Sequence, residues 1–189
     1  MHLCVEKIKS FGILNHNKKI KYCFKKCPID LDENKRYIVF GENNNIITKK
    51  ANTQYEWVGI MCENQLFENT ENIWKIKILN SSHKYIMVLV CQIDFNINKS
   101  SYSNCGWYYY IANSTLYSGP PYKYRGKALN LSNVKDEITV IMDMKKGALK
   151  FIINNQDKGF SYEGIPLDKP LFPIVFLDEN GDSIEIIDS

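Results

Sequence analysis

The hydrophobic residues of this chain recur with the period of β-strands rather than of helices. Residues 74–78 (WKIKI) alternate strictly between apolar side chains and lysine, as a strand with one solvated face does. Residues 87–91 (MVLVC) are apolar throughout, which indicates a central strand buried on both faces. No stretch with helical periodicity follows after about residue 12. The pattern predicts an all-β protein.

Short β-branched or aromatic runs, separated by turns rich in Asn, Asp, Gly and Lys, continue to the end of the chain. The predicted strands are 36–40, 57–62, 73–79, 85–93, 107–112, 138–143, 149–153, 172–177 and 183–187. The predicted turns are 41–45, 145–147, 154–157 and 178–182. Strands of this number and spacing, with no repeat of about 20–50 residues, predict an antiparallel two-sheet β-sandwich rather than a propeller or solenoid.

Residues 1–30 differ from the rest of the chain because they are rich in lysine and contain three of the six cysteines. We expect them to form a basic N-terminal arm or an extra strand pair that packs on the domain. The end of a linker from a larger parent protein is the alternative. Residues 31–189 are the predicted β-sandwich.

Charge and composition narrow the class of protein. Lys+Arg 24 against Asp+Glu 21 leaves a net charge of +3, too small for a dedicated binder of nucleic acid or anionic membrane. No apolar run reaches the ~18 residues that cross a bilayer. Glu6, Lys7 and Lys9 interrupt the N-terminus, which makes a poor signal peptide. We therefore predict a cytoplasmic protein, in which Cys62 and Cys91 act as small hydrophobic residues.

The sequence offers little for catalysis. It contains only three histidines, no nucleophile elbow and no glycine pattern of a nucleotide-binding loop. Glu185 and Asp188 suggest a glucanase-type site, but residues three apart on a strand face opposite sides and cannot flank one glycosidic bond. We predict no enzymatic activity.

A metal site has weak support. Cys23 and Cys27, with His16 and Cys4 upstream, supply four residues of the types that bind zinc, but the tight Cys-x-x-Cys spacing is missing. Coincidence in a chain with six cysteines is the better interpretation. We predict no metal and no cofactor.

Residues 106–111 (GWYYYI) form the most informative segment. On a strand, Trp107 and Tyr109 point to one face, while Tyr108 and Tyr110 point to the other. One face can fill the core. The other must present its tyrosines to solvent or a partner, or pack them against further protein, and the pattern leaves both alternatives open.

An ordered series of motifs resembles the SPRY domain family. The resemblance covers about residues 32–187, and the stretch 141–175 is its most specific part. The matching segments are 73–76 (IWKI), 106–107 (GW), 116–119 (LYSG), 141–151 (IMDMKKGALKF), 154–160 (NNQDKGF) and 171–175 (LFPIV). Within the family the pattern is most similar to the SPRY domain–SOCS box adaptors, although no SOCS-box helix follows.

The resemblance implies a bent two-sheet sandwich that binds a partner protein or short peptide motif through loops on one face, without catalysis or cofactor. It could serve as the substrate-recognition part of a larger assembly. Carried onto this chain, the partner-binding residues are Tyr108, Tyr110, Asp178, Glu179 and Asn180. We expect a monomer that binds neither nucleic acid nor membrane. The alternative is a carbohydrate-binding, lectin-like sandwich, because lectins share this architecture.

Two departures from the family pattern have consequences. Residues 135–140 (KDEITV) lack the glycine that usually precedes the central hairpin, but we expect the hairpin 143–151 to survive. An aromatic tip common among relatives is replaced by Asp178, Glu179 and Asn180, so the resemblance does not imply that this chain shares their partner preference.

Overall fold

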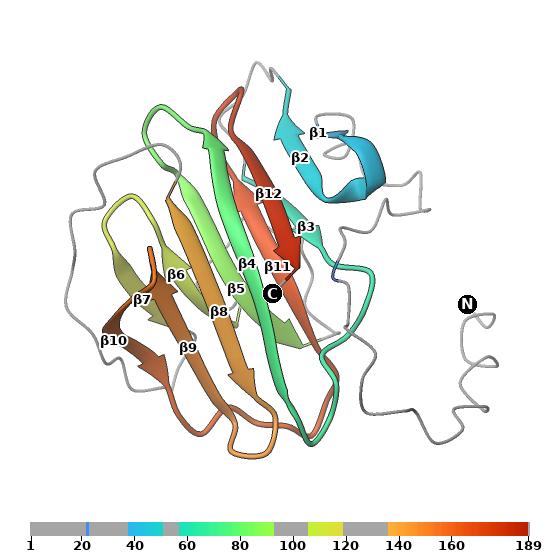
Figure 1. Cartoon of the computed structure of the whole chain (residues 1–189), viewed down its shortest axis with the longest axis vertical. Coiled ribbons are helices and arrows are strands. Elements are labelled where there is room, and N and C mark those ends of the chain that lie inside the picture. The colour runs from blue at the N-terminus through green and yellow to red at the C-terminus, as the bar shows by residue number, and fades with distance from the viewer. Residues whose placement is uncertain (1–21, 23–37, 51–56, 93–105, 119–135, 189) are drawn as a thin grey trace, which may run out of the picture.

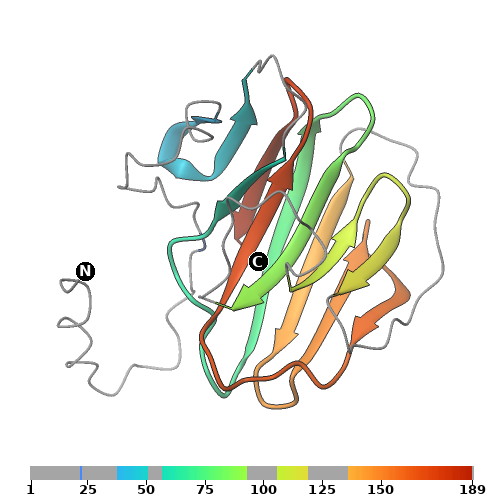
Figure 2. The same ribbon diagram turned by 180° about the vertical axis from the view of Figure 1, so that it is seen from behind.

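Two antiparallel sheets packed face to face make up the part of the protein that the structure describes. The computed structural model describes residue 22 and residues 38–50, 57–92, 106–118 and 136–188. One sheet has seven strands in the order β1-β2-β12-β4-β8-β9-β10, and the other has five in the order β3-β11-β5-β6-β7. The seven-stranded sheet lies in front in Figure 1, and the five-stranded sheet lies in front in Figure 2. The predicted β-sandwich is confirmed.

The strands of each sheet come from distant parts of the chain. The seven-stranded sheet contains β1 (Ile38–Phe40), β2 (Ile46–Lys49), β12 (Ser183–Asp188), β4 (Glu71–Asn80), β8 (Glu137–Asp143), β9 (Ala148–Ile153) and β10 (Gln156–Tyr162). The five-stranded sheet contains β3 (Val58–Met61), β11 (Leu171–Leu177), β5 (Ile86–Gln92), β6 (Trp107–Tyr110) and β7 (Thr115–Ser118). A short 3-10 helix, Glu42–Asn44, joins β1 to β2.

Each of the nine predicted strands corresponds to a strand of the structure, and β2, β7 and β10 were missed. The predicted turn 154–157 was too long: Asn154 and Asn155 alone adopt positive φ (49° and 61°), as in a tight hairpin, and β10 begins at Gln156. β10 escaped detection because a register shift between Asp157 and Phe160 breaks its alternation. The hairpin of β8 and β9 forms despite the missing glycine.

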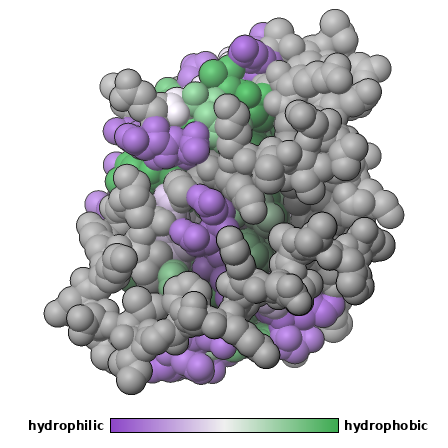
Figure 3. Space-filling view, turned by 90° about the vertical axis from the view of Figure 1, so that its right-hand side faces the viewer, coloured by the Kyte–Doolittle hydropathy of each residue, from purple (hydrophilic) through white to green (hydrophobic). Residues whose placement is uncertain are grey.

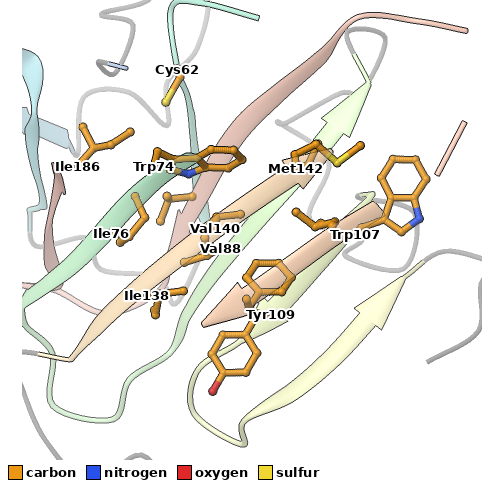
Figure 4. Packing of buried hydrophobic residues seen from close by; sticks show 14 of the residues in the cluster. Cys62, Trp74, Ile76, Val88, Trp107, Tyr109, Ile138, Val140, Met142 and Ile186 are labelled. Carbon is orange, nitrogen blue, oxygen red and sulfur yellow. The ribbon is translucent and has the colours of Figure 1, made fainter. Parts of the chain in front are cut away.

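The main core lies between the two sheets. β4 supplies Trp74, Ile76 and Ile78, each no more than 1% exposed, and its other face is half-buried, as the strict alternation predicted. Val88 of β5 and Tyr109 of β6 face them from the five-stranded sheet (Figure 4).

A second apolar cluster covers the outer face of the five-stranded sheet. Its buried members are Met87, Leu89, Cys91, Tyr108, Ile174 and Phe176. β11 is consequently buried at every position, and β5 at all but its last. This confirms that residues 87–91 form a central strand with two buried faces.

Hydrophobic residues also reach the surface near the top of the side that carries β1 and β2 (Figure 3). On β1, Val39 is 38% exposed, while Ile38 and Phe40 are partly buried against the main core. This short strand closes one edge of the seven-stranded sheet through its pairing with β2.

Gly59 on β3 gives a test of the second cluster. A Cβ atom at residue 59 would lie 2.7 Å from Cε1 of Phe176, so no side chain fits there without displacing this ring. We expect Gly59→Ala to lower the free energy of unfolding by about 1–3 kcal/mol, as overpacking does. Urea denaturation measures the loss. Adding Phe176→Leu should recover part of it, whereas strictly additive losses would contradict the proposed steric cause.

Candidate functional site

The four aromatic residues of β6 alternate between the faces as predicted. Trp107 and Tyr109 belong to the main core, and Tyr108 and Tyr110 belong to the opposite face of the sheet. The structure also decides between exposure and packing. Tyr108 is packed, since it is only 7% exposed and its ring stacks on that of Tyr117 at 5.4 Å, whereas Tyr110 is half-buried. Of the two alternatives that the pattern left open, packing against further protein therefore holds for Tyr108.

Tyr110 lies at the centre of a group of aromatic rings on the outer face, which we call the aromatic patch: Trp57, Tyr85, Tyr110 and Tyr117. The ring centroid of Tyr110 lies 5.9 Å from that of Trp57, 6.5 Å from Tyr85 and 6.3 Å from Tyr117. Tyr85 and Tyr117 are each 38% exposed. The patch thus has a half-buried centre and two rings that reach solvent.

A hydrogen-bonded tyrosine from the seven-stranded sheet holds β6 and β7, which carry part of the patch. The hydroxyl of Tyr162 on β10 is shared between the carbonyl oxygens of Tyr108, at 3.0 Å, and Tyr117, at 2.6 Å. Both acceptors belong to paired positions of β6 and β7. This buried contact ties the edge of the five-stranded sheet to the seven-stranded sheet.

The loop between β11 and β12, residues 178–182, carries the other three predicted residues. Its backbone is held by Lys49 on β2: the Lys49 N–H donates to the Asp182 carbonyl, and the Gly181 N–H donates to the Lys49 carbonyl, both at 2.9 Å. The Lys49 ammonium, on a side chain buried in the structure, donates to the backbone oxygen of Asp178. Asn180 is exposed at the tip of this loop.

Burial raises the pKa of two carboxyl groups in the loop. It raises the pKa of Asp178 above its ordinary value, more than the neighbouring Lys49 lowers it. Burial likewise raises the pKa of Asp182, more than hydrogen bonds from the Ser81 hydroxyl and the Glu179 N–H lower it. Asp182 is 1% exposed and accepts the Glu179 N–H at 2.9 Å, so this carboxyl shapes the loop from inside.

Glu179 connects the loop to the aromatic patch. One of its carboxylate oxygens lies 2.5 Å from Nδ1 of His83, and the other accepts the His83 backbone N–H at 3.0 Å. The His83 ring stacks on Tyr85 at 5.6 Å. The loops of residues 81–85 and 178–182 both lie at the top of the sandwich in Figure 1. Tyr110 is therefore linked to Glu179 of the loop through the rings of Tyr85 and His83.

Sequence reasoning missed Trp57, His83, Tyr85 and Tyr117 as members of this surface. Tyr85 has the same strand parity as Met87, which pairs with Tyr110, so correct strand pairing would have placed it on the outer face. Tyr117 lies on β7, a strand that was not predicted, and pairs there with Tyr108 of β6. The alternation along the strand indicated which face Tyr85 occupies. The strand that pairs with it cannot be read from a single sequence.

The described residues include only part of the other candidate chemistry. Within the described residues, no group of three or more His, Cys, Asp or Glu side chains could hold a metal ion. The four residues weighed as zinc ligands, Cys4, His16, Cys23 and Cys27, lie outside those residues. Glu185 accepts a hydrogen bond from Asn45 at 3.2 Å. No helix among the described residues is long and apolar enough to cross a membrane.

Comparison with known proteins defines the class. A family model described as the SPRY domain matches residues 57–189, and the chain belongs to this family, whose members are generally protein–protein interaction modules. Similar solved structures include the SPRY domain of human HERC1 (18% identity, TM-score 0.65, covering 80% of this chain and 92% of that chain).

Two further solved structures share the fold. The TRIM65 PSpry domain has 12% identity and a TM-score of 0.64, covering 89% of this chain and 92% of that chain. The stonustoxin structure has 12% identity and a TM-score of 0.65, covering 89% of this chain and 27% of that chain. None of the curated proteins matches the chain. The resemblance to SPRY domain–SOCS box adaptors in particular stays a prediction.

The buried carboxyl of Asp182 predicts a pH dependence of stability. Because its pKa is raised, the folded chain holds this proton more tightly than the unfolded chain. The free energy of unfolding should therefore fall as the pH rises through the interval above the ordinary aspartate pKa of about 4. Asp182→Asn keeps an acceptor for the Glu179 N–H but cannot ionise, so we expect a smaller loss between about pH 4 and pH 7.

Urea denaturation at several pH values measures this slope. Asp143→Asn is the matched control of opposite sign, because a hydrogen bond from the Lys145 N–H lowers the pKa of Asp143. Removing that carboxylate should reduce stability at neutral pH and leave it unchanged well below the folded-state pKa. Identical slopes for the Asp182→Asn variant and the original chain would refute the role of burial.

Proposed function

We propose that this chain is a non-catalytic interaction module that recognises a short peptide segment or surface of a partner protein. The binding surface consists of the aromatic patch and the loop 178–182. The observation that carries the proposal is the continuity of this surface: Tyr85 and Tyr117 are exposed around Tyr110, and the Glu179–His83 pair joins them to the loop.

The chemistry of the surface suits a protein partner. Tyrosine offers a rigid apolar ring with a hydroxyl that can donate or accept a hydrogen bond, and tyrosine and tryptophan are enriched among residues that dominate binding energy. The exposed Asn180 adds an amide that can pair with a peptide backbone. Asp182 and Glu179 are engaged within the protein, so we assign them the task of holding the loop rather than direct contact.

The remaining parts of the proposal rest on the sequence. The net charge of +3 favours a protein partner over nucleic acid or an anionic membrane. We propose a cytoplasmic monomer that could form the recognition part of a larger assembly. Tyr108 contributes from beneath, by supporting the Tyr117 ring.

Substitution of the exposed rings tests the surface. We expect the double variant Tyr85→Ala/Tyr117→Ala to bind its partner at least about tenfold more weakly, because loss of two exposed aromatic contacts exceeds the 1.4 kcal/mol that corresponds to a factor of ten. Asn180→Ala should weaken binding by a smaller factor. The measurement is proximity capture from native lysate with the whole chain, followed by titration of the captured protein.

Phe67→Ala is the matched control, since Phe67 is also 38% exposed but lies beside Asn72, at the start of β4. It should bind like the original chain, with all variants showing the same circular dichroism. Equal capture by the double variant and the original chain would contradict the proposed surface. A glycan array run in parallel tests the lectin alternative, which saturable sugar binding lost in Tyr85→Ala would favour.

A further inference from the structure

Tyr22 lies far outside the region that the SPRY family model matches, yet its side chain is part of the main core. It is 3% exposed. Its hydroxyl donates a hydrogen bond of 2.7 Å to Oδ1 of Asn72, fifty residues further along the chain. Its ring centroid lies 5.6 Å from that of Trp74, with the rings inclined at 51°. These contacts show that the Tyr22 side chain is held firmly in the core.

The groups that receive Tyr22 are held by the rest of the sandwich. Asn72 is 2% exposed, and its Oδ1 also accepts the Phe67 N–H at 2.8 Å, while its Nδ2 donates to the Phe67 carbonyl at 3.0 Å. An amide oxygen accepts two hydrogen bonds, so the Phe67 N–H and the Tyr22 hydroxyl complete its capacity. Trp74 is 1% exposed on the inner face of β4. Asn72 and Trp74 thus form a socket that β4 and the loop before it would hold without Tyr22.

The electrostatics of the socket favour a neutral phenol. Burial, and to a lesser extent the nearby Cys62 thiol, raise the pKa of Tyr22. The hydroxyl therefore stays protonated and can donate at any physiological pH. The socket lies at the start of β4, whereas the loop that carries His83 follows the end of this ten-residue strand. The two sites are thus at opposite ends of the sandwich (Figure 1).

We infer that Asn72 and Trp74 form a phenol-binding socket that docks the N-terminal segment of this chain, with Tyr22 as its anchoring residue. Tyr22 thereby belongs to the folded unit. The folded unit then begins well before residue 57, where the family match starts. Burial of a large aromatic side chain at the end of the core makes this docking a determinant of stability.

Two substitutions of Tyr22 in the full chain test the inference: one removes the ring, and the other removes only the hydroxyl. We expect Tyr22→Ala to lower Tm by about 6–15 °C, as loss of a buried aromatic residue does in a protein of this size. Tyr22→Phe, which keeps the ring and loses the hydroxyl, should lower Tm by about 2–4 °C. Tyr85→Ala, the same substitution at an exposed position, should change Tm by no more than about 2 °C.

Chemical rescue separates a specific socket from general loss of core. Added 4-methylphenol should raise the Tm of Tyr22→Ala in a saturable manner, and toluene, which has the ring without the hydroxyl, should raise it less. Unchanged Tm in Tyr22→Ala, or equal rescue by toluene, would overturn the inference. If Tyr22→Ala does not fold, the comparison of Tyr22→Phe with the original chain decides, and an unchanged Tm there would equally overturn it.

Discussion

Burial of β11 on both faces fixes the arrangement of the five-stranded sheet and of the loops at its end. All seven of its residues are buried, and they contribute to both clusters: Leu171, Val175 and Leu177 belong to the main core, and Ile174 and Phe176 belong to the second apolar cluster. β5 beside it has the same environment. Two adjacent strands with no solvated face cannot slip in register without exposing apolar side chains, so these strands fix the position of whatever follows them.

The candidate site is formed where these two strands end. β5 begins just after Tyr85, and β11 ends just before the loop 178–182, so the antiparallel pairing brings the aromatic patch and the loop to one end of the sheet. The loop must then satisfy its own polar groups next to the core. Lys49 and Asp182 do so from buried positions, which leaves Asn180 as the exposed tip. Under the proposed function, the partner would contact residues that neither the core nor the loop's own hydrogen bonds bury, such as Asn180.

The burial of individual strands could be predicted from the sequence, but the contacts that form the candidate site could not. The alternation in residues 74–78 and the continuous apolar run 87–91 report local burial, and both predictions are confirmed. β7 and β10 were missed because their polar or irregular sequences carry no clear period. The packing of Tyr108 under Tyr117 and the link from Glu179 through His83 to Tyr85 depend on contacts between distant segments. No local pattern encodes those contacts, and the same holds for Tyr22 and Asn72.

The most direct test of the central claim is hydrogen–deuterium exchange of the whole chain with and without its captured partner. Binding should slow exchange in residues 81–85, 110–117 and 178–182, which together form the proposed surface. Residues 66–72 and 144–147, at the opposite end of the sandwich, should exchange at unchanged rates. Slowed exchange confined to that opposite end, with the aromatic patch and the loop unaffected, would contradict the account.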